Sequence, residues 1–411
     1  MQQTTLFQTE EVPVFRRYLP EIEKVATHSG SPEKNIWKVP FTISQLGYLV
    51  HNHYRYYGKF PSVIAGQLLE QYQPKTKKDW VLDNFCGSGT TLVEAKLRGI
   101  KALGVDVSWL SVLASNVKVR HIDFEHLDEL LNNLLKTFKR SKRFGVENDF
   151  VQKWFADEAA SDLSRLSRGL EKLVDGSPEF DFLLVGFLAI VRRVSRAFDG
   201  EVRPHINKEK RQREVLPAFK KKISDMRKRH AEFMSLLNVN TECSAIVDNN
   251  INPCPTLGSG SCYLAISHPP YLNSFNYRPV YSLEHFWGKP FEYLYVEEAM
   301  SGLASSELRA HPANESVTEL YFNHLKLCYE QVFKLQRYGG VLAVVIGDCT
   351  RNKKLIPVLD RTREVVQEIG YETIQINYRT THYGLGKYAY KHRADYHGDA
   401  TKKDGILVFR K

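Results

Sequence analysis

The sequence predicts an α/β fold in which a mostly parallel sheet carries helices on both faces and is interrupted by a helical insert. Three observations support this prediction. Residues 80–107 alternate between short apolar strands and an apolar helix around a glycine turn. Residues 110–243 show helical periodicity without further glycine turns, and from residue 244 strands and helices alternate again. With 411 residues, the chain is long enough for one large α/β domain and a second module.

The first strand–turn–helix unit is expected to form a ligand-binding cradle. Trp80 to Leu82 reads as a buried strand. Gly87 and Gly89 then allow a tight turn before a helix from Thr91 to Leu97, and backbone N–H groups at such a helix start face a ligand. The second strand ends with Asp106, about 20 residues after the glycines, where a carboxylate can accept both hydroxyls of a ribose. An ordinary connection without a ligand is the alternative.

The residues around the turn indicate which ligand it holds. No Lys follows Gly89, so a phosphate loop for a nucleoside triphosphate is not favoured. Leu92 stands where a dinucleotide fingerprint requires a third glycine. Asp83, before the turn, suits a cationic ligand better than a pyrophosphate. S-adenosylmethionine, which has a sulfonium, an ammonium and a ribose, fits this pattern.

The segment D-N-F-C-G-S-G-T-T, from Asp83 to Thr91, resembles motif I of the amino-methylating DNA methyltransferases, which use S-adenosylmethionine. Asp106 matches the ribose-binding acid of that family. The resemblance implies a seven-stranded, mostly parallel, Rossmann-like sheet with the cofactor at the carboxyl ends of its strands. It also implies cofactor contacts by Asp83, Phe85, Cys86, Gly87, Ser88, Gly89, Thr90, Thr91, Asp106 and Val107.

Two further segments resemble cofactor-binding motifs of the same family. Lys59, Phe60 and Pro61 are similar to the K-F-P element of motif X, which lies beside the methionine end of the cofactor. Alternatively, these three residues only turn the chain. Asp248 follows a short apolar strand from Ser244 to Val247, like the acid of the third motif that binds the adenine amino group. An acid without a ligand is an equally good interpretation there.

A proline corner follows another predicted strand. The strand from Cys262 to Ile266 leads directly into Ser267, His268, Pro269, Pro270 and Tyr271. Two prolines end the strand and fix the backbone, so a carbonyl oxygen and an aromatic ring are held in set positions. Methylation of an exocyclic amine needs such a corner, because acceptors on its two hydrogens localise a lone pair that is otherwise delocalised into the base. An extruded base also needs an aromatic face, which Tyr271 offers.

These residues resemble motif IV of the family, which is usually Asp, Asn or Ser followed by Pro-Pro and an aromatic residue. The resemblance assigns catalysis to Ser267, His268, Pro269, Pro270 and Tyr271. His268 departs from the usual pattern. Its neutral imidazole can accept a hydrogen bond beside the Pro269 carbonyl, whereas a charged imidazole can only donate. Ser267 is an alternative acceptor, and a degenerate site that binds DNA without methylating it is a further alternative.

The segment Leu272 to Tyr277 is similar to the continuation of motif IV in enzymes that methylate the N4 amine of cytosine. We therefore prefer cytosine N4 as the target, with adenine N6 close behind. A related class methylates guanine amines in RNA with a similar Pro-Pro corner. No Pro-Cys nucleophile motif occurs in this stretch, which argues against methylation at carbon five of cytosine.

The second half of the helical region is strongly basic. Between Arg192 and His230 there are fourteen Lys or Arg and five Asp or Glu. Such a concentration neutralises phosphates and gives salt-dependent affinity, although a solvated helix face is the alternative. Asp199 to Arg213 contains Gly200 and Pro204 and is expected to be a mobile basic loop. Nucleic-acid contacts are expected from Arg193, Arg196, Arg203, Lys208, Lys210, Arg211, Arg213 and Lys221.

The remaining segments complete the predicted fold. Residues 1 to about 45 are expected to form an irregular N-terminal arm. Helices are expected at Leu127 to Phe138, Asp157 to Val174, Phe180 to Phe198, Pro217 to Leu237 and Thr318 to Leu335. Thr373 to Tyr378 and Ile406 to Arg410 are expected to pair as antiparallel strands, and Thr380 to Asp399 to form a surface loop for nucleic acid or solvent.

Composition indicates the setting in which the chain acts. Its net charge of +10 and pI near 9.1 favour an anionic partner. The six cysteines include no C-x-x-C pair, which predicts reduced thiols in a cytoplasmic protein with neither a zinc site nor disulfides. The first residues lack the apolar run of a signal peptide, and the longest apolar segment, Phe180 to Val191, is too short to span a bilayer.

We therefore expect the chain to be one enzyme built from three segments. Residues 1–109 hold the N-terminal arm and the cofactor-binding half, 110–243 the helical basic insert for target recognition, and 244–411 the catalytic half. The resemblance implies a site-specific methyltransferase that acts on double-stranded DNA with S-adenosylmethionine and no metal. A cognate restriction endonuclease is a further partner that the resemblance raises.

Overall fold

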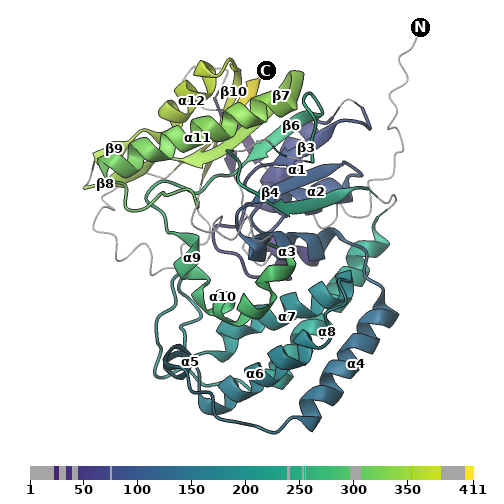
Figure 1. Ribbon diagram of the computed structural model, residues 1–411. Helices are drawn as coiled ribbons and strands as arrows, with labels where there is room; N and C mark the ends of the chain where they lie inside the picture. Colours follow the sequence, from purple (N-terminus) through teal and green to yellow (C-terminus); the bar gives the residue numbers. More distant parts are fainter. Residues whose placement is uncertain are drawn as a thin grey trace.

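The computed structural model describes residues 23–26, 34–38, 45–74, 76–237, 241–251, 254, 256–296, 307–352, 354–380 and 403–411. Within these residues, nine strands form one sheet in the order β1-β2-β10-β11-β7-β6-β3-β4-β5 (Figure 1). The strands are β1 (Glu23–Ala26), β2 (Lys34–Lys38), β3 (Trp80–Asp83), β4 (Ala102–Asp106), β5 (Cys243–Val247), β6 (Cys262–Ser267), β7 (Gln336–Gly347), β10 (Glu372–Thr380) and β11 (Lys403–Arg410). A separate hairpin pairs β8 (Cys349–Arg351) with β9 (Lys354–Ile356).

The seven strands from β10 to β5 are the predicted, mostly parallel sheet. Strands β7, β6, β3, β4 and β5 run parallel to one another. Strand β11 is antiparallel to both β7 and β10, which confirms the expected terminal pair. The expectation of a wholly irregular N-terminal arm is wrong for β1 and β2. Strand β2 pairs in parallel with β10, because the edge of a sheet presents unpaired backbone groups to any neighbouring strand.

Helices cover both faces of the sheet, so its central strands are buried on both sides. Successive residues of β3 alternate between the two faces: Val81 packs in the same apolar cluster as helices α1 and α2, and Leu82 in the cluster of α11 and α12. All six residues of β6 are buried. These face helices are α1 (Ser62–Gln71), α2 (Thr90–Leu97), α3 (Trp109–Val119), α11 (Glu315–Leu335) and α12 (Val358–Glu368).

A second helical layer lies below the sheet in Figure 1 and has its own apolar core. Its long helices match the predicted periodic segments to within a few residues at most ends. It contains α4 (Phe124–Arg140), α5 (Asp149–Trp154), α6 (Asp157–Glu171), α7 (Pro178–Val194) and α8 (Val215–Ser235). Helix α7 is buried over nearly its whole length, which confirms the buried helix expected from Phe180 to Val191. None of the helices described here is both long and apolar enough to cross a membrane.

Short helices connect the two layers. Helices α9 (Tyr277–Val280) and α10 (Ser282–Gly288) lie between them in Figure 1, followed by the 3-10 helix η4 (Lys289–Leu294). Helix α3 is buried throughout and packs against β4 and β5 as well as α7. The segment before α1 forms two further 3-10 helices, η2 (Gln45–Gly47) and η3 (Leu49–Asn52). Residues of α9 and α10 line the same cavity as the residues at the carboxyl ends of β3, β4 and β6.

Candidate active site

A cavity of about 300 Å³ lies at the carboxyl ends of β3, β4 and β6. It brings together the glycine turn and the proline corner, which are about 180 residues apart in the chain. Of the predicted site residues, those that line it are Phe60, Phe85, Cys86, Gly87, Ser88, Thr90, Asp106, Val107, His268 and Pro270. In an open parallel sheet, this edge is where ligands bind.

The turn between β3 and α2 requires its two glycines. Gly87 has φ +49° and Gly89 has φ +74°, a region that side chains rarely adopt. A Cβ on Gly87 would lie 2.9 Å from the ring of Tyr56, and one on Gly89 would lie 2.8 Å from the Cβ of Ser115. The Ser115 hydroxyl also donates to the Gly87 carbonyl at 3.0 Å. The loop is therefore packed closely between Tyr56 on one side and Ser115 on the other.

Asp106 lines the cavity at the end of β4, and both of its carboxylate oxygens are oriented by backbone groups. Oδ2 accepts from the N–H of Gly87 and Oδ1 from the N–H of Ser108, each at 2.9 Å. Burial raises the pKa of this carboxyl to about 6. A carboxylate held in this way keeps lone pairs for hydroxyl donors, so it fits a ribose.

Asp83 lies behind the turn and does not line the cavity. Its Oδ1 accepts from the N–H of Phe85 at 3.2 Å, and burial raises its pKa to about 7. Gly89 and Thr91, which were also expected to contact the cofactor, lie outside the lining as well. Asp83 is the last residue of β3, and its side chain binds the backbone of the loop instead of facing the cavity.

The proline corner presents a different set of groups to the cavity than the sequence suggested. His268 lines it, with its ring stacked on Phe60 at 4.9 Å between centroids and 22° between planes. Ser267 points to the other face of the sheet, where its hydroxyl lies 3.3 Å from that of Tyr329. The alternative of Ser267 as acceptor would therefore require the side chain to leave a buried site.

The rest of the corner is anchored from the side of α11. The Pro270 carbonyl accepts from the Tyr321 hydroxyl at 2.8 Å. Pro269 is buried and outside the lining. The ring of Tyr271 lies 5.3 Å from that of His268 and packs against the α11 cluster, so it does not line the cavity. The expected stacking face is therefore not presented by Tyr271 in this structure.

Aromatic rings from other segments line the cavity. Tyr56 stacks between Tyr277 and Tyr281, with centroids 5.6 Å apart in both pairs and interplanar angles of 23° and 21°. We call these three residues the tyrosine wall. The sequence assigned no site role to Tyr56 or Tyr281, although the tyrosine-rich runs in which they lie were a signal. Only the fold brings the two runs together.

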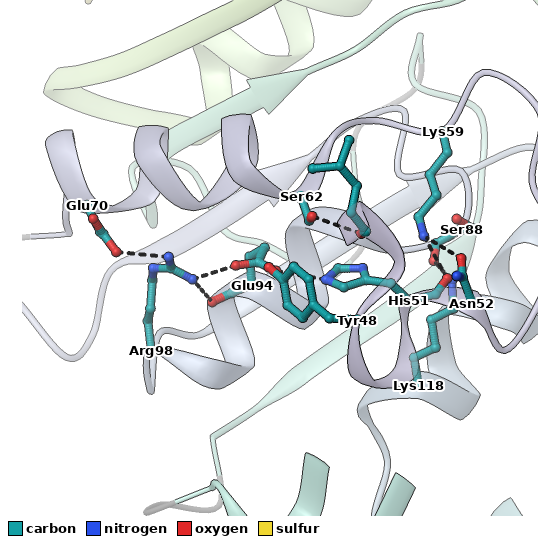
Figure 2. Close-up of polar contacts among 11 residues, drawn as sticks. Tyr48, His51, Asn52, Lys59, Ser62, Glu70, Ser88, Glu94, Arg98 and Lys118 are labelled. Atoms are coloured by element: carbon teal, nitrogen blue, oxygen red, sulfur yellow. Dashed lines mark hydrogen bonds and ion pairs between the residues drawn. The ribbon is translucent and has the colours of Figure 1, made fainter. Parts of the chain in front are cut away.

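Only one of the three residues of the K-F-P segment, Lys59 to Pro61, lines the cavity. Phe60 lines the cavity, while Lys59 does not and lies among polar groups of the preceding segment (Figure 2). The Lys59 ammonium donates to the carbonyl of His51 at 2.7 Å and lies 3.5 Å from Oδ1 of Asn52. Burial lowers its pKa to about 7. Pro61 precedes the first residue of α1 and also lies outside the lining.

A buried polar network connects the segment before α1, which contains Tyr48 and His51, to helix α2, which follows the glycine turn (Figure 2). Glu94 is fully buried and accepts from Tyr48, from His51 at 2.7 Å and from Arg98 at 2.7 Å. Arg98 also pairs with Glu70 of α1 at 2.9 Å. Buried ion pairs of this kind fix relative positions because breaking them leaves an uncompensated charge. The network therefore sets the position of η3 relative to α2.

Lys118 of α3 supports the turn directly. Its side chain is fully buried, and its ammonium donates to the carbonyl of Ser88 at 2.5 Å (Figure 2). Burial lowers its pKa well below the usual value. Because Ser88 lines the cavity, this lysine holds a part of the turn that faces the cavity.

The end of β5 differs from the expectation in one residue. The N–H of Asp248 donates to the carbonyl of Asp106 at 3.2 Å, but its carboxylate accepts from the N–H of Asn249 at 2.7 Å and lies outside the lining. The next two side chains, Asn249 and Asn250, line the cavity instead. Adenine binding by Asp248 therefore stays a prediction, while the two residues after it are the ones that face the cavity.

Most of the predicted nucleic-acid contacts are exposed on the helical layer: Arg193, Arg203, Lys208, Arg211, Arg213 and Lys221. Two others hold the loop together. Arg196 donates to the carbonyl of Gln152 at 2.8 Å, and Lys210 donates to that of Ala197 at 2.7 Å. Residues 199–213 form the expected loop without a helix, but these bonds and a bridge between Ala197 and Ile206 fasten it.

The chain is similar in sequence to known DNA methyltransferases. A family model described as DNA methylase matches residues 3–115, about a quarter of the chain. The chain is 23% identical over 388 residues to the type II methyltransferase M.BsoBI of Geobacillus stearothermophilus, covering 84% of this chain and 70% of that protein. It is 35% identical over 104 residues to the type II methyltransferase M.MjaII of Methanocaldococcus jannaschii, which is 25% of this chain and 19% of the relative.

A shorter match connects the chain to an RNA enzyme. It is 37% identical over 68 residues to a tRNA (guanine(10)-N2)-dimethyltransferase of Methanocaldococcus jannaschii, which covers 14% of this chain and 19% of that enzyme. The match to M.BsoBI, the family model and the cavity at the strand ends together support one class of enzyme, an S-adenosylmethionine-dependent DNA methyltransferase.

Proposed function

We propose that this chain transfers a methyl group to an exocyclic amino group of a base in DNA, with cytosine N4 as the preferred target and adenine N6 as the alternative. One observation carries the proposal: the glycine turn and the proline corner line the same cavity. A donor held by the turn and a base held by the corner would therefore meet without rearrangement of the sheet.

The residues around the turn fit the donor, S-adenosylmethionine, which supplies an electrophilic methyl group when bound. Asp106 would hold the ribose hydroxyls, and the close-packed backbone of Gly87 and Ser88 would lie against the ligand. Asn249 and Asn250 offer amide groups for the adenine, the role that the sequence assigned to Asp248.

The proline corner would prepare the target amine. His268 would accept one amine hydrogen. The carbonyl of Pro269 stays the predicted acceptor of the other, although Pro269 lies outside the present lining, because the carbonyl of Pro270 already accepts from Tyr321. With both hydrogens held, the lone pair of the amine is directed at the methyl group, and the imidazole of His268 can take the proton that the amine loses. We assign the stacking role to Tyr277 of the tyrosine wall in place of Tyr271.

Transfer of labelled methyl groups to mixed-sequence duplex DNA and to tRNA, followed by nucleoside analysis, tests the proposal. We expect N4-methylcytosine from DNA. His268→Ala should lose transfer, whereas His268→Asn, which restores a residue usual in motif IV, should retain it. Undiminished transfer by the alanine variant would contradict the acceptor role. Loss with Tyr271→Ala but not with Tyr277→Ala would contradict the assignment of the stacking face.

RNA is the second candidate substrate, because one matched relative is named as a tRNA guanine methyltransferase. Label in N2-methylguanosine of tRNA, without label in DNA, would select it. Target recognition by residues 110–243, a cytoplasmic location and a cognate endonuclease also remain predictions.

A further inference from the structure

A second cavity, of about 330 Å³, lies on the other side of the tyrosine wall from the candidate active site. Its lining comes from the segment before α1, from the end of α7, from the basic loop and from α8 and α10. We call it the arginine cavity, because four of its lining residues are arginines: Arg55, Arg192, Arg193 and Arg213.

The charges around this cavity are predominantly positive. Lys222 adds a fifth cation, and burial, together with Arg229 and Arg193, lowers its pKa to about 8. Arg213 lies 4.0 Å from Asp199, which is already paired with Lys210 at 2.9 Å. Among the described residues, no ion pair is found for Arg55 or Arg193. Cations that repel one another around a shared space create a site for an anion.

Three buried polar groups of the same cavity also lack hydrogen-bond partners among the described residues. Tyr54 and Glu284 are each only 5% exposed, and the hydroxyl of Tyr54 and Oε2 of Glu284 have no hydrogen-bond partner among the described residues. The hydroxyl of Tyr57 also has no hydrogen-bond partner among the described residues. Buried polar atoms are normally hydrogen-bonded in native proteins, so these groups can bind a polar ligand that enters the cavity. Burial raises the pKa of Glu284 to about 7, so this acid opposes an anion less than an exposed carboxylate would.

The arginine cavity is one aromatic layer away from the candidate active site. The N–H of Tyr57, in the arginine cavity, donates to the hydroxyl of Tyr281 at 2.7 Å. Tyr281 lines the active-site cavity, and its ring centroid lies 6.2 Å from that of Tyr54 and 6.1 Å from that of Tyr57. A DNA strand whose base enters the active-site cavity would therefore have its neighbouring backbone within reach of the arginine cavity.

We propose that the arginine cavity binds a backbone phosphate of the DNA strand that carries the target base, close to that base in the sequence. This inference rests on the proposed function. The ligand is a phosphodiester held by Arg55, Arg193 and Arg213, with Tyr54 and Tyr57 as further donors. Arginines at such a site fix the position of the strand and do not read its sequence.

Salt-dependent binding of a fluorescent 20-base-pair duplex of mixed sequence tests this inference on the full chain with S-adenosylmethionine present. Each lost phosphate contact lowers the slope of log affinity against log salt by about one. We expect this change for both Arg193→Ala and Arg213→Ala, which alter exposed positions. Arg140→Ala, at an exposed position at the end of α4 and outside the cavity, should leave the slope unchanged.

Kinetics give a second readout. Loss of the phosphate should raise the KM for duplex DNA about tenfold in Arg193→Ala, with kcat unchanged, because a charged hydrogen bond is removed away from the reacting atoms. Unchanged slopes in both arginine variants would overturn the inference even if the wild-type chain methylates DNA. If the wild-type chain binds and methylates only tRNA, the proposed function fails. The same salt slopes, measured with tRNA for the two arginine variants, then show whether the arginine cavity binds a phosphate of that RNA.

Discussion

Replacing Asp83 by Asn should stabilise the fold, and the gain should depend on pH. Asp83 is 3% exposed, and burial raises its pKa from 3.8 to about 7. The native state therefore holds the proton more tightly than the unfolded state, so the stability that protonation contributes is complete below about pH 4 and is lost as the pH rises through about 7. An amide has no such loss, and its oxygen can still accept from the N–H of Phe85.

The magnitude follows from the difference between the two pKa values. A difference of about three units corresponds to roughly 4 kcal/mol in the free energy of unfolding at pH 8. At pH 5, where the native carboxyl is protonated and the unfolded one is mostly ionised, the advantage of Asn falls to roughly 2 kcal/mol. The gain for Asp83→Asn should therefore about double between these two pH values.

Urea unfolding at pH 5 and pH 8, followed by tryptophan fluorescence, measures the effect, with Trp80 in the same strand as a nearby reporter. Asp225→Asn, at an exposed position of α8, serves as the control and should change stability by less than about 0.5 kcal/mol at either pH. An equal gain at both pH values, or a less stable Asn variant at pH 8, would refute the assignment of the raised pKa to a buried carboxyl behind the turn.

Three further predictions concern the cofactor loop. Lys118→Met removes the donor to Ser88 and should weaken S-adenosylmethionine binding about tenfold by calorimetry, whereas Lys96→Met, which removes a buried donor to the carbonyl of Thr241, should not; equal effects would exclude a specific role. Gly87→Ala adds a methyl group 2.9 Å from the ring of Tyr56 and should abolish cofactor binding, while Gly176→Ala, with a similar positive φ but open space, should cost only about 1–2 kcal/mol of stability and leave binding intact. Cofactor affinity should be constant above about pH 7 and fall about tenfold per pH unit well below pH 6, since protonation of Asp106 removes an acceptor for the ribose; an affinity that does not change between pH 5 and pH 7.5 would contradict that role.

The two halves of the molecule use charge in different ways. Behind the glycine turn, Glu94, Arg98 and Lys118 are buried and satisfied by specific partners, so they fix the backbone that would hold the donor. On the helical layer, Arg193 and Arg213 are exposed beside a cavity and have weak or no ion pairs among the described residues. The same residue types therefore serve packing in one place and, in our proposal, binding in the other.

The sequence alone determined the α/β fold, the two corners and the ends of most helices. These features depend on local chemistry: Gly87 and Gly89 adopt positive φ, two prolines end β6, and apolar residues repeat with the period of a strand or a helix. The approach of the two corners also followed, because parallel strands bring their carboxyl ends to one edge of a sheet.

Only the tertiary structure decided which side chains at those positions reach the cavity. Asp83, Lys59 and Tyr271 belong to segments that reach the cavity but do not line it, while Asn249 and Tyr281 line it without a motif of their own. Strands β1 and β2 and the tyrosine wall likewise join parts of the chain that are far apart in sequence. The direction of a side chain depends on its neighbours in space, and these are set by packing between distant segments, which a local pattern does not contain.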